Sequence, residues 1–240
     1  MRFAIVIATY HRPNGKTLGY IKRAIESVNK QTYKEWDLIL VGDKYEPIEE
    51  LYEIGKMVNT TNGNKVFILE NKITERDYIF NGHLRWFIAG ATSMNLGLNE
   101  ARKMGYTHYC HLDDDDEWGA EHLANFNDVF TNYPKCIFAY SKSTYINHCP
   151  LPREHVASIH DNNLMVRGGN VIHSAVCFRI DVLKCDYYTT FDPSKIYGPS
   201  DFIMWNGISD FIHGNIDKYS CIHIPKITCF KYTEEEAFRG

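Results

Sequence analysis

The sequence predicts an α/β fold, with a Rossmann-like nucleotide-binding first half on a mostly parallel sheet and a mixed α/β second half. Residues 3–8 form a continuous apolar, β-branched run bounded by polar residues, the pattern of a strand buried on both faces. From residue 17 to residue 31 apolar side chains recur at helical spacing, and residues 36–41 are a second apolar run. Strand, helix and strand in this order define a βαβ unit, whose crossover is right-handed.

The next elements continue this alternation. The pattern predicts helices over residues 48–58 and 91–104, the second ended by Gly105, and strands over 66–69 and 106–112. Residues 71–90 are polar and irregular, and we expect a long functional loop there. Structureless loops of more than about 12 to 15 residues are otherwise uncommon in compact domains.

The second half of the chain is less regular. Helices are predicted over residues 121–132 and 200–212, strands over 136–145 and 171–178, and a pair of short strands over 221–232. Residues 148–170, with two prolines and two adjacent glycines, are predicted to be a long flexible connection. Neither an internal repeat nor a linker composition is present, so we expect one domain.

Composition excludes several classes of protein. The 240 residues carry 26 Lys and Arg against 30 Asp and Glu, a net charge of −4, so no basic field is available to bind nucleic acid. The apolar run near the start is too short for a transmembrane segment or a secretory signal. The 7 cysteines lie far apart without a C-x-x-C pair and are expected to be reduced. We therefore predict a cytoplasmic protein, and peripheral contact with a membrane stays open.

Polar residues follow three of the predicted strands. Thr9 to Arg12 follow the first, Asp43 the second, and Asp113 to Asp116 the strand over 106–112. Ligands of open α/β sheets bind beyond the carboxyl ends of the strands, so these residues are expected to share one site. There Tyr10 could stack on a base and Asp43 could accept hydrogen bonds from a base imide or a ribose.

The four consecutive aspartates are the strongest local signal. Two carboxylates about 4 Å apart repel by about 4 kcal/mol at an effective dielectric of 20, so the run favours a bound cation over a solvated acidic turn. An EF-hand starting at Asp114 does not fit, because Trp118 and Asn125 occupy its fifth and twelfth positions. Oxygen donors of this kind suit Mg²⁺ or Mn²⁺, with substrate phosphates completing the coordination.

The order of these motifs resembles family 2 glycosyltransferases with the GT-A fold. Residues 3–43 resemble the opening of that family. Residues 94–101, followed by H-L-D-D-D-D-E-W, are similar to its N-x-G-x-x-x-A helix and D-x-D motif. The resemblance covers nearly the whole chain. It implies a single GT-A catalytic domain over 1–240, with a nucleotide-sugar-binding half over 1–118 and an acceptor-binding half over 119–240.

The resemblance also implies a reaction. An inverting enzyme would move a sugar from a nucleotide-diphosphate sugar, with a UDP type favoured, to a hydroxyl of a glycan or glycoconjugate. A divalent metal, Mn²⁺ or Mg²⁺, would be its cofactor.

Donor-binding roles carry over position by position. Thr9 and Tyr10 would contact the base, with Tyr10 stacking, and Asp43 would bind its imide. Asp115 would touch the ribose, Asp116 would ligate the metal with Asp114 as the first acid of the triplet, and Asp113 would support them. The register within the four aspartates stays open by one position. Arg12 and Asn95 complete the donor-binding set.

Two departures from the family pattern concern the donor. The acidic pair that often follows the second strand has Gly42 as its first member here. Met94 stands where an Arg commonly precedes the helix Asn. The cation that faces the diphosphate is therefore assigned to Arg85 or Arg76 in the loop over 71–90, with a solvated arginine as the alternative.

On the acceptor side, residues 197–205 resemble the family segment in which an acidic residue begins a helix. The resemblance implies that Asp201 is the catalytic base. A helix N-terminus also stabilises a carboxylate, so the residues themselves agree with an ionised Asp201. His173, Trp118 and Trp205 are acceptor-side candidates, each with packing as the alternative, and His111 is expected in the core.

Three other functions were weighed against this prediction. A sugar nucleotidyltransferase would open with a glycine-rich G-x-G-T-R segment, where this chain has T-Y-H-R-P. A dehydrogenase would carry G-x-G-x-x-G after a strand, which is absent. A noncatalytic sugar-binding or nucleotide-binding module is left open.

Overall fold

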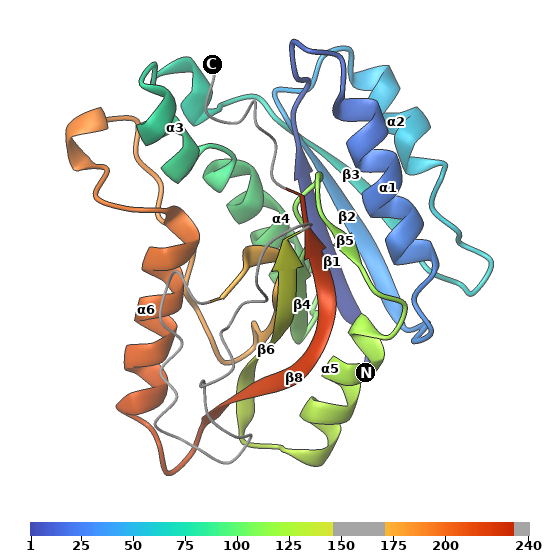
Figure 1. Ribbon diagram of the computed structural model, residues 1–240, viewed down its shortest axis with the longest axis vertical. Coiled ribbons are helices and arrows are strands. Elements are labelled where there is room, and N and C mark those ends of the chain that lie inside the picture. The colour runs from blue at the N-terminus through green and yellow to red at the C-terminus, as the bar shows by residue number, and fades with distance from the viewer. Residues whose placement is uncertain (146–170, 233–240) are drawn as a thin grey trace.

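The computed structural model describes residues 1–145 and 171–232 (Figure 1). The predicted connection over 148–170 and Cys149 lie outside the described residues. The described strands form one eight-stranded sheet in the order β3-β2-β1-β4-β7-β6-β8-β5. Their bounds are β1 Phe3–Thr9, β2 Trp36–Asp43, β3 Val66–Asn71, β4 His108–His111, β5 Glu117–Trp118, β6 Cys136–Tyr145, β7 Val176–Arg179 and β8 Ser220–Lys231.

The directions of the strands place the carboxyl ends of most of them at one edge of the sheet. Strands β3, β2, β1 and β4 are parallel, and β7 runs antiparallel between β4 and β6. Strand β8 is parallel to β6, and the short β5 is antiparallel to β8. The carboxyl ends of β1, β2, β4, β6 and β8 therefore lie on the same edge, where β7 begins.

Helices cover both faces of this sheet (Figure 1). On one face, α1 (Thr17–Asn29), α2 (Ile48–Gly55) and α5 (His122–Asn132) contribute to one apolar cluster that includes Phe3, Ile5 and Ile7 of β1. On the other face, α4 (Ala91–Lys103) and α6 (Ser200–His213) pack on a core that includes Ala4 and Val6. Because both faces of β1 are covered, its unbroken apolar run follows from the fold, and the predicted α/β class is confirmed.

Three local predictions need correction, and one short strand was not predicted. The loop expected over residues 71–90 contains a 3₁₀ turn at Glu75–Asp77 and the helix α3 (Gly82–Ile88), which the side chain of Asn81 caps. The strand expected over 171–178 begins with a 3₁₀ turn at His173–Ala175. The pair of short strands expected over 221–232 is the single strand β8, whose register with β6 shifts midway. The two-residue β5 is too short to give a periodic signal.

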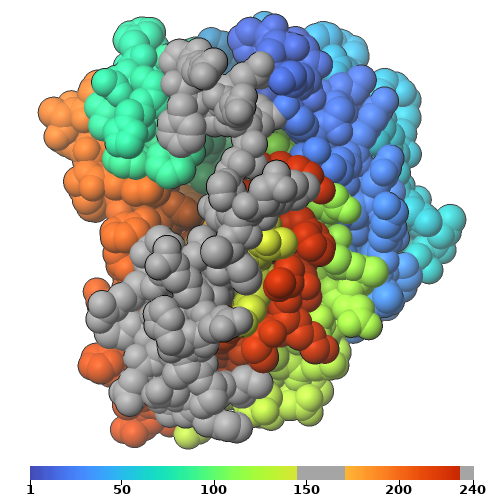
Figure 2. All heavy atoms as spheres, viewed as in Figure 1, coloured from blue at the N-terminus to red at the C-terminus, as the bar shows by residue number. Residues whose placement is uncertain are grey.

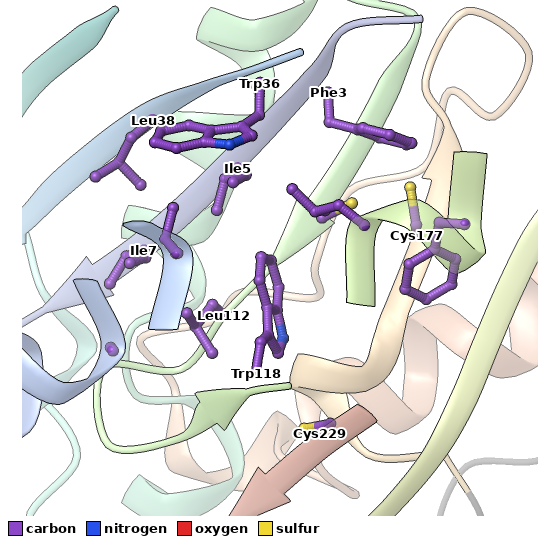
Figure 3. Close-up of a cluster of buried hydrophobic side chains, with 14 of the residues drawn as sticks. Phe3, Ile5, Ile7, Trp36, Leu38, Leu112, Trp118, Cys177 and Cys229 are labelled. Atoms are coloured by element: carbon purple, nitrogen blue, oxygen red, sulfur yellow. The ribbon is translucent and has the colours of Figure 1, made fainter. Parts of the chain in front are cut away.

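Large side chains fill the core (Figure 3). Trp36 and Trp118 lie in one buried cluster with Leu112, Cys177 and Cys229. The six described cysteines are free thiols and four of them are buried.

Among the described residues, none of the helices combines the length and apolar character that a membrane crossing requires.

Gly97 sets how closely α4 approaches the sheet. A Cβ atom there would lie 2.5 Å from Cγ1 of Val6 and 3.1 Å from Cγ2 of Val41, so only glycine fits without movement of β1. We expect Gly97→Ala to lower the free energy of unfolding by about 1 to 3 kcal/mol, measured by urea denaturation. Gly207→Ala in α6 is the control: no atom lies within 4 Å of its added methyl group. It should be neutral or stabilising, because alanine favours helix over glycine. A Gly97→Ala protein as stable as the wild type would contradict this account.

Candidate functional site

A buried ion pair joins the loop after β1 to the acidic run after β4. Arg12 donates hydrogen bonds from Nη1 to Oδ2 and from Nη2 to Oδ1 of Asp114, each of 2.7 Å. Thr9 donates a third to the same carboxylate, at 2.6 Å. Burial acts to lower the pKa of the Arg12 guanidinium, but the hydrogen bonds and charge of Asp114 outweigh it and raise that pKa. Arg12 therefore stays charged, and its two hydrogen bonds to Asp114 hold the two loops together.

These contacts do not fit the metal-ligand role predicted for Asp114. Both of its oxygens already face Arg12, and one also accepts from Thr9. Ligand oxygens gather instead on Asp113, Asp115 and Asp116, one from each within 4.8 Å of the others. Thr9 and Arg12, both expected to bind the donor, lie in this buried anchor.

Asp116 has the features of a cation ligand. Its side chain is completely buried, and Oδ1 has no hydrogen-bond partner in the described part of the chain. Burial raises the pKa of Asp116 to about 7, with the charges of Asp113 and Asp115 adding to the rise and Lys231 opposing it. Burial also raises the pKa of Asp115 to about 6. A divalent cation would favour the ionised form of both, and carboxylate oxygens are the donors that Mg²⁺ and Mn²⁺ prefer, so these residues fit the metal.

Asp113 is held by a closed ring of hydrogen-bonding side chains. Its Oδ1 atom faces Nε2 of His111 at 3.1 Å and Nδ1 of His173 at 2.9 Å. The outer nitrogens contact the hydroxyls of Tyr109, at 3.2 Å from His111, and Tyr187, at 2.8 Å from His173. The two hydroxyls lie 3.4 Å apart. His173 therefore points at Asp113 and not at an open acceptor surface, and His111 is buried as expected.

At the ends of β1 and β2, Asp43 and Tyr10 are linked by Arg76. Asp43 is buried and accepts hydrogen bonds from Ser93 on Oδ1, and from Thr74 and Arg76 on Oδ2. The Arg76 guanidinium also lies 3.5 Å from the centre of the Tyr10 ring. The structure thus links two of the three residues predicted to bind the base, Tyr10 and Asp43, through Arg76.

Both departures from the family pattern have packing reasons. A side chain at position 42 would have its Cβ 2.8 Å from Cδ2 of Leu51 and 2.9 Å from Cβ of Tyr45, so an acidic residue has no room there. Met94 packs in the core between α4 and the sheet. An arginine at that position would place a charge in apolar surroundings.

Arg85 and Asn95 make contacts other than those predicted. Arg85 donates to the carbonyl oxygens of Ile79, at 2.7 Å, and Phe80, at 3.4 Å. Asn95 donates to the carbonyl of Tyr187 and accepts from its backbone N–H, both at 2.8 Å. Asn95 therefore joins α4 to the segment before α6. Neither contact lies on the acidic cluster.

Trp118 and Trp205 do not fit the acceptor-side role expected of them. Trp118 is buried in the cluster of Figure 3 and donates from Nε1 to the carbonyl of Ser174 at 2.6 Å. Trp205 is fully buried and lies edge-on to Phe138 and Phe178. Packing, the alternative reading for both, accounts for them.

Other aromatic side chains are exposed near α6, and sequence reasoning missed them. Tyr78, beside α3, contacts Phe191 with ring centres 4.8 Å apart, and Tyr197 contacts Tyr188 at 5.2 Å. Figure 2 shows the green segment that includes α3 next to the orange segment that leads into α6. We call this set the aromatic surface; it comprises Tyr78 (51% exposed), Phe191 (41%), Tyr197 (71%) and Phe202 (38%).

Asp201 lies in the first turn of α6, as expected, next to Phe202 of this surface. Its Oδ1 atom accepts a hydrogen bond from the backbone N–H of Phe202 at 2.8 Å. Burial is the largest cause of the raised pKa of Tyr187, and its interaction with Tyr109 is the next. The negative charges of Asp201 and Asp113 raise this pKa further. Both carboxylates therefore lie within electrostatic reach of one hydroxyl.

The sheet order, the two helical layers and the acidic cluster at the carboxyl edge define a protein with the GT-A fold. Residues 1–349 of S. aureus TarS superpose with a TM-score of 0.66 at 11% identity, over 97% of this chain and 60% of that chain. The mannosyltransferase PcManGT of Pyrobaculum calidifontis gives a TM-score of 0.60 at 12% identity, over 99% of this chain and 58% of that one. This chain thus spans about 60% of the length of these solved structures.

Sequence similarity then gives the family. The chain is 46% identical, over 245 aligned positions, to an uncharacterized glycosyltransferase of Acanthamoeba polyphaga mimivirus, covering 100% of this chain and 97% of that protein. The chain therefore belongs to the glycosyltransferases, as its motifs predicted. No protein-family model matches it.

The buried anchor of Arg12 and Asp114 yields a stability prediction. Arg12→Met leaves the Asp114 charge buried without its partner, and we expect it to lower the free energy of unfolding by about 3 to 5 kcal/mol. Adding Asp114→Asn to that variant should recover part of the loss, and urea denaturation measures both. Lys56→Met removes an exposed ion pair with Glu53 and should change stability by less than about 1 kcal/mol. An Arg12→Met protein no less stable than this control would contradict the anchor.

Proposed function

We propose that this chain is an inverting glycosyltransferase that moves a sugar from a nucleoside-diphosphate sugar to a hydroxyl of a glycan or glycoconjugate. The observation that carries the proposal is the buried Oδ1 of Asp116, which has no hydrogen-bond partner among the described residues. It belongs to a carboxylate cluster at the edge of the sheet where β1 ends before Tyr10 and β2 ends at Asp43. Similar folds support it: TarS was solved with UDP and with UDP-GlcNAc, and PcManGT with GDP-Man and Mn²⁺. Residues 1–118 would bind the donor and 119–240 the acceptor.

The base of the donor would bind at Tyr10 and Asp43. Oδ1 of Asp43 receives one described hydrogen bond, from Ser93, so it can accept another from an imide N–H. The N3–H of uracil, the base of the UDP-type donor that the family resemblance favours, is such a donor. Arg76 covers the Tyr10 ring, so its guanidinium must move aside or become part of the stack when the base binds. Thr9 and Arg12 would not contact the base, because both are bonded to Asp114. They would fix the loop that carries Tyr10.

The acidic cluster would hold the metal. Asp113, Asp115 and Asp116 would hold Mn²⁺ or Mg²⁺, with Asp115 also near the donor ribose. When bound, the ion supplies positive charge that stabilises the departing diphosphate.

Asp201 would act as the catalytic base. It takes the proton from the acceptor hydroxyl while that oxygen bonds to the anomeric carbon of the donor sugar. The bond from this carbon to the diphosphate breaks at the same time, and the electron pair leaves with the phosphate oxygen. Attack opposite to the leaving group inverts the configuration. The aromatic surface beside Asp201 offers ring faces on which acceptor sugars can stack.

The donor reaction tests the function. The chain is incubated with UDP-sugars and GDP-sugars and MnCl₂, and we expect slow release of free nucleoside diphosphate from at least one of them. Asp116→Ala should abolish this release and the metal-dependent part of donor binding, because a cation ligand is lost. Asp128→Ala, at an exposed aspartate of α5, should change neither.

Other outcomes of that experiment identify the rival functions. Nucleotide binding without release under every condition would indicate a noncatalytic module. Formation of a nucleotide sugar from a nucleoside triphosphate and a sugar phosphate would indicate a nucleotidyltransferase.

Asp201→Asn tests the catalytic base. The amide keeps the size of the side chain but cannot take the proton, so transfer to an acceptor should fall by about 100-fold or more with donor binding unchanged. Transfer is measured by chromatography of the glycan product, and NMR of that product should show the inverted anomer. Near wild-type transfer, or a retained configuration, would refute the assignment.

Two variants serve as controls for that measurement. Asp210→Asn changes an exposed aspartate of the same helix and should leave transfer intact. Phe191→Ala removes a ring of the aromatic surface and should raise the acceptor KM with little change in kcat. If it leaves the acceptor KM unchanged, the acceptor does not stack on this surface.

A further inference from the structure

Three lysine and arginine side chains contact the acidic run in the described part of the chain. Arg12 is buried against Asp114 through both of its Nη atoms. Arg23 donates to the backbone carbonyl of Asp115 and lies 3.8 Å from the ring centre of Tyr232. Lys231 is the third, at the carboxyl end of β8.

Lys231 approaches the cluster itself. Its Nζ lies 3.2 Å from Oδ2 of Asp113 and 3.4 Å from Oδ2 of Asp116, and 26% of its side chain is exposed. Arg12, in contrast, is held by short bonds inside the protein, with only 9% of its side chain exposed. Lys231 therefore combines contact with the cluster, access to solvent and a long stem.

The donor needs such a cation. A nucleoside diphosphate would bring negative charge to the carboxylates proposed to hold the metal, and the negative charge on the diphosphate would grow as its bond to the sugar breaks. Arg76 and Arg85, expected to meet it, are bonded to Asp43 and to backbone carbonyls. Met94 of α4 is an apolar core residue and supplies no charge there.

We propose that Lys231 is the side-chain cation that binds the diphosphate of the donor. The proposal rests on the proposed function. Before the donor binds, the ammonium compensates the charges of Asp113 and Asp116. It can reach phosphate oxygens that approach the same carboxylates, because the four-carbon side chain of lysine is flexible.

Binding of phosphate-bearing probes tests this role. UDP, GDP and inorganic pyrophosphate are titrated calorimetrically into the full chain with MnCl₂, and uridine and guanosine serve as probes without phosphate. Lys231→Met should weaken binding of the diphosphates by about tenfold or more and leave binding of the nucleosides unchanged. Lys231→Arg, which keeps the charge, should lose less. Lys226→Met, on the same strand and bonded to Asn125, should bind like the wild type.

A second measurement needs no variant. Acetylation of the wild-type chain, followed by mass spectrometry, should show that the diphosphate bound with MnCl₂ protects Lys231 severalfold, with the exposed Lys226 unprotected.

The outcomes separate the two proposals. If the wild type binds none of the diphosphates, the proposed function fails and this inference with it. If the wild type binds but Lys231→Met binds within twofold of it, or acetylation of Lys231 is unaffected, only the role of Lys231 is overturned. Lys231 is then a structural counter-charge, and Lys231→Met would lower the melting temperature alone.

Discussion

The site depends on one buried ion pair, Arg12 with Asp114. It connects residues 102 positions apart in the sequence and fixes the loop after β1 against the loop after β4. Because the carboxylate of Asp114 faces Arg12 inside the protein, the four consecutive aspartates have two different roles. One carboxylate binds Arg12, and the other three form the cluster that is proposed to hold the metal. A buried pair of this kind adds little net stability compared with an apolar pair, but it allows few alternative arrangements, so its contribution here is to position Tyr10 and the acidic cluster.

The sequence predicted the sheet well because its signals are local and periodic. The apolar run of β1 and the amphipathic pattern of α1 each follow from burial of one element. The polar residues at the strand ends could also be placed, since parallel strands must deliver them to one edge. The roles within the site were less accessible. Four identical aspartates carry no periodic signal that singles out Asp114, and partners such as Arg76 depend on contacts between distant segments.

Burial explains why the aromatic predictions did not fit. Trp118 and Trp205 are near the proposed site in sequence, but both side chains point into the cores on either side of the sheet. The exposed rings come instead from irregular segments, which show no pattern in the sequence. Asn95 is a similar case. The sequence predicted its motif, but its amide bonds the backbone of Tyr187, so the motif joins α4 to the segment before α6.

The hydrogen bonds in the ring around Asp113 run in one donor-to-acceptor direction on the His111 side. Burial lowers the pKa of His111 to about 4, so the imidazole is neutral at physiological pH and carries one proton. Its Nε2 must donate that proton to Asp113, and Nδ1 must then accept from the hydroxyl of Tyr109. On this side of the ring every hydrogen points toward the carboxylate. Oδ1 of Asp113 can take up a proton only if this order reverses, and Oδ2 faces the ammonium of Lys231, so both oxygens act as hydrogen-bond acceptors.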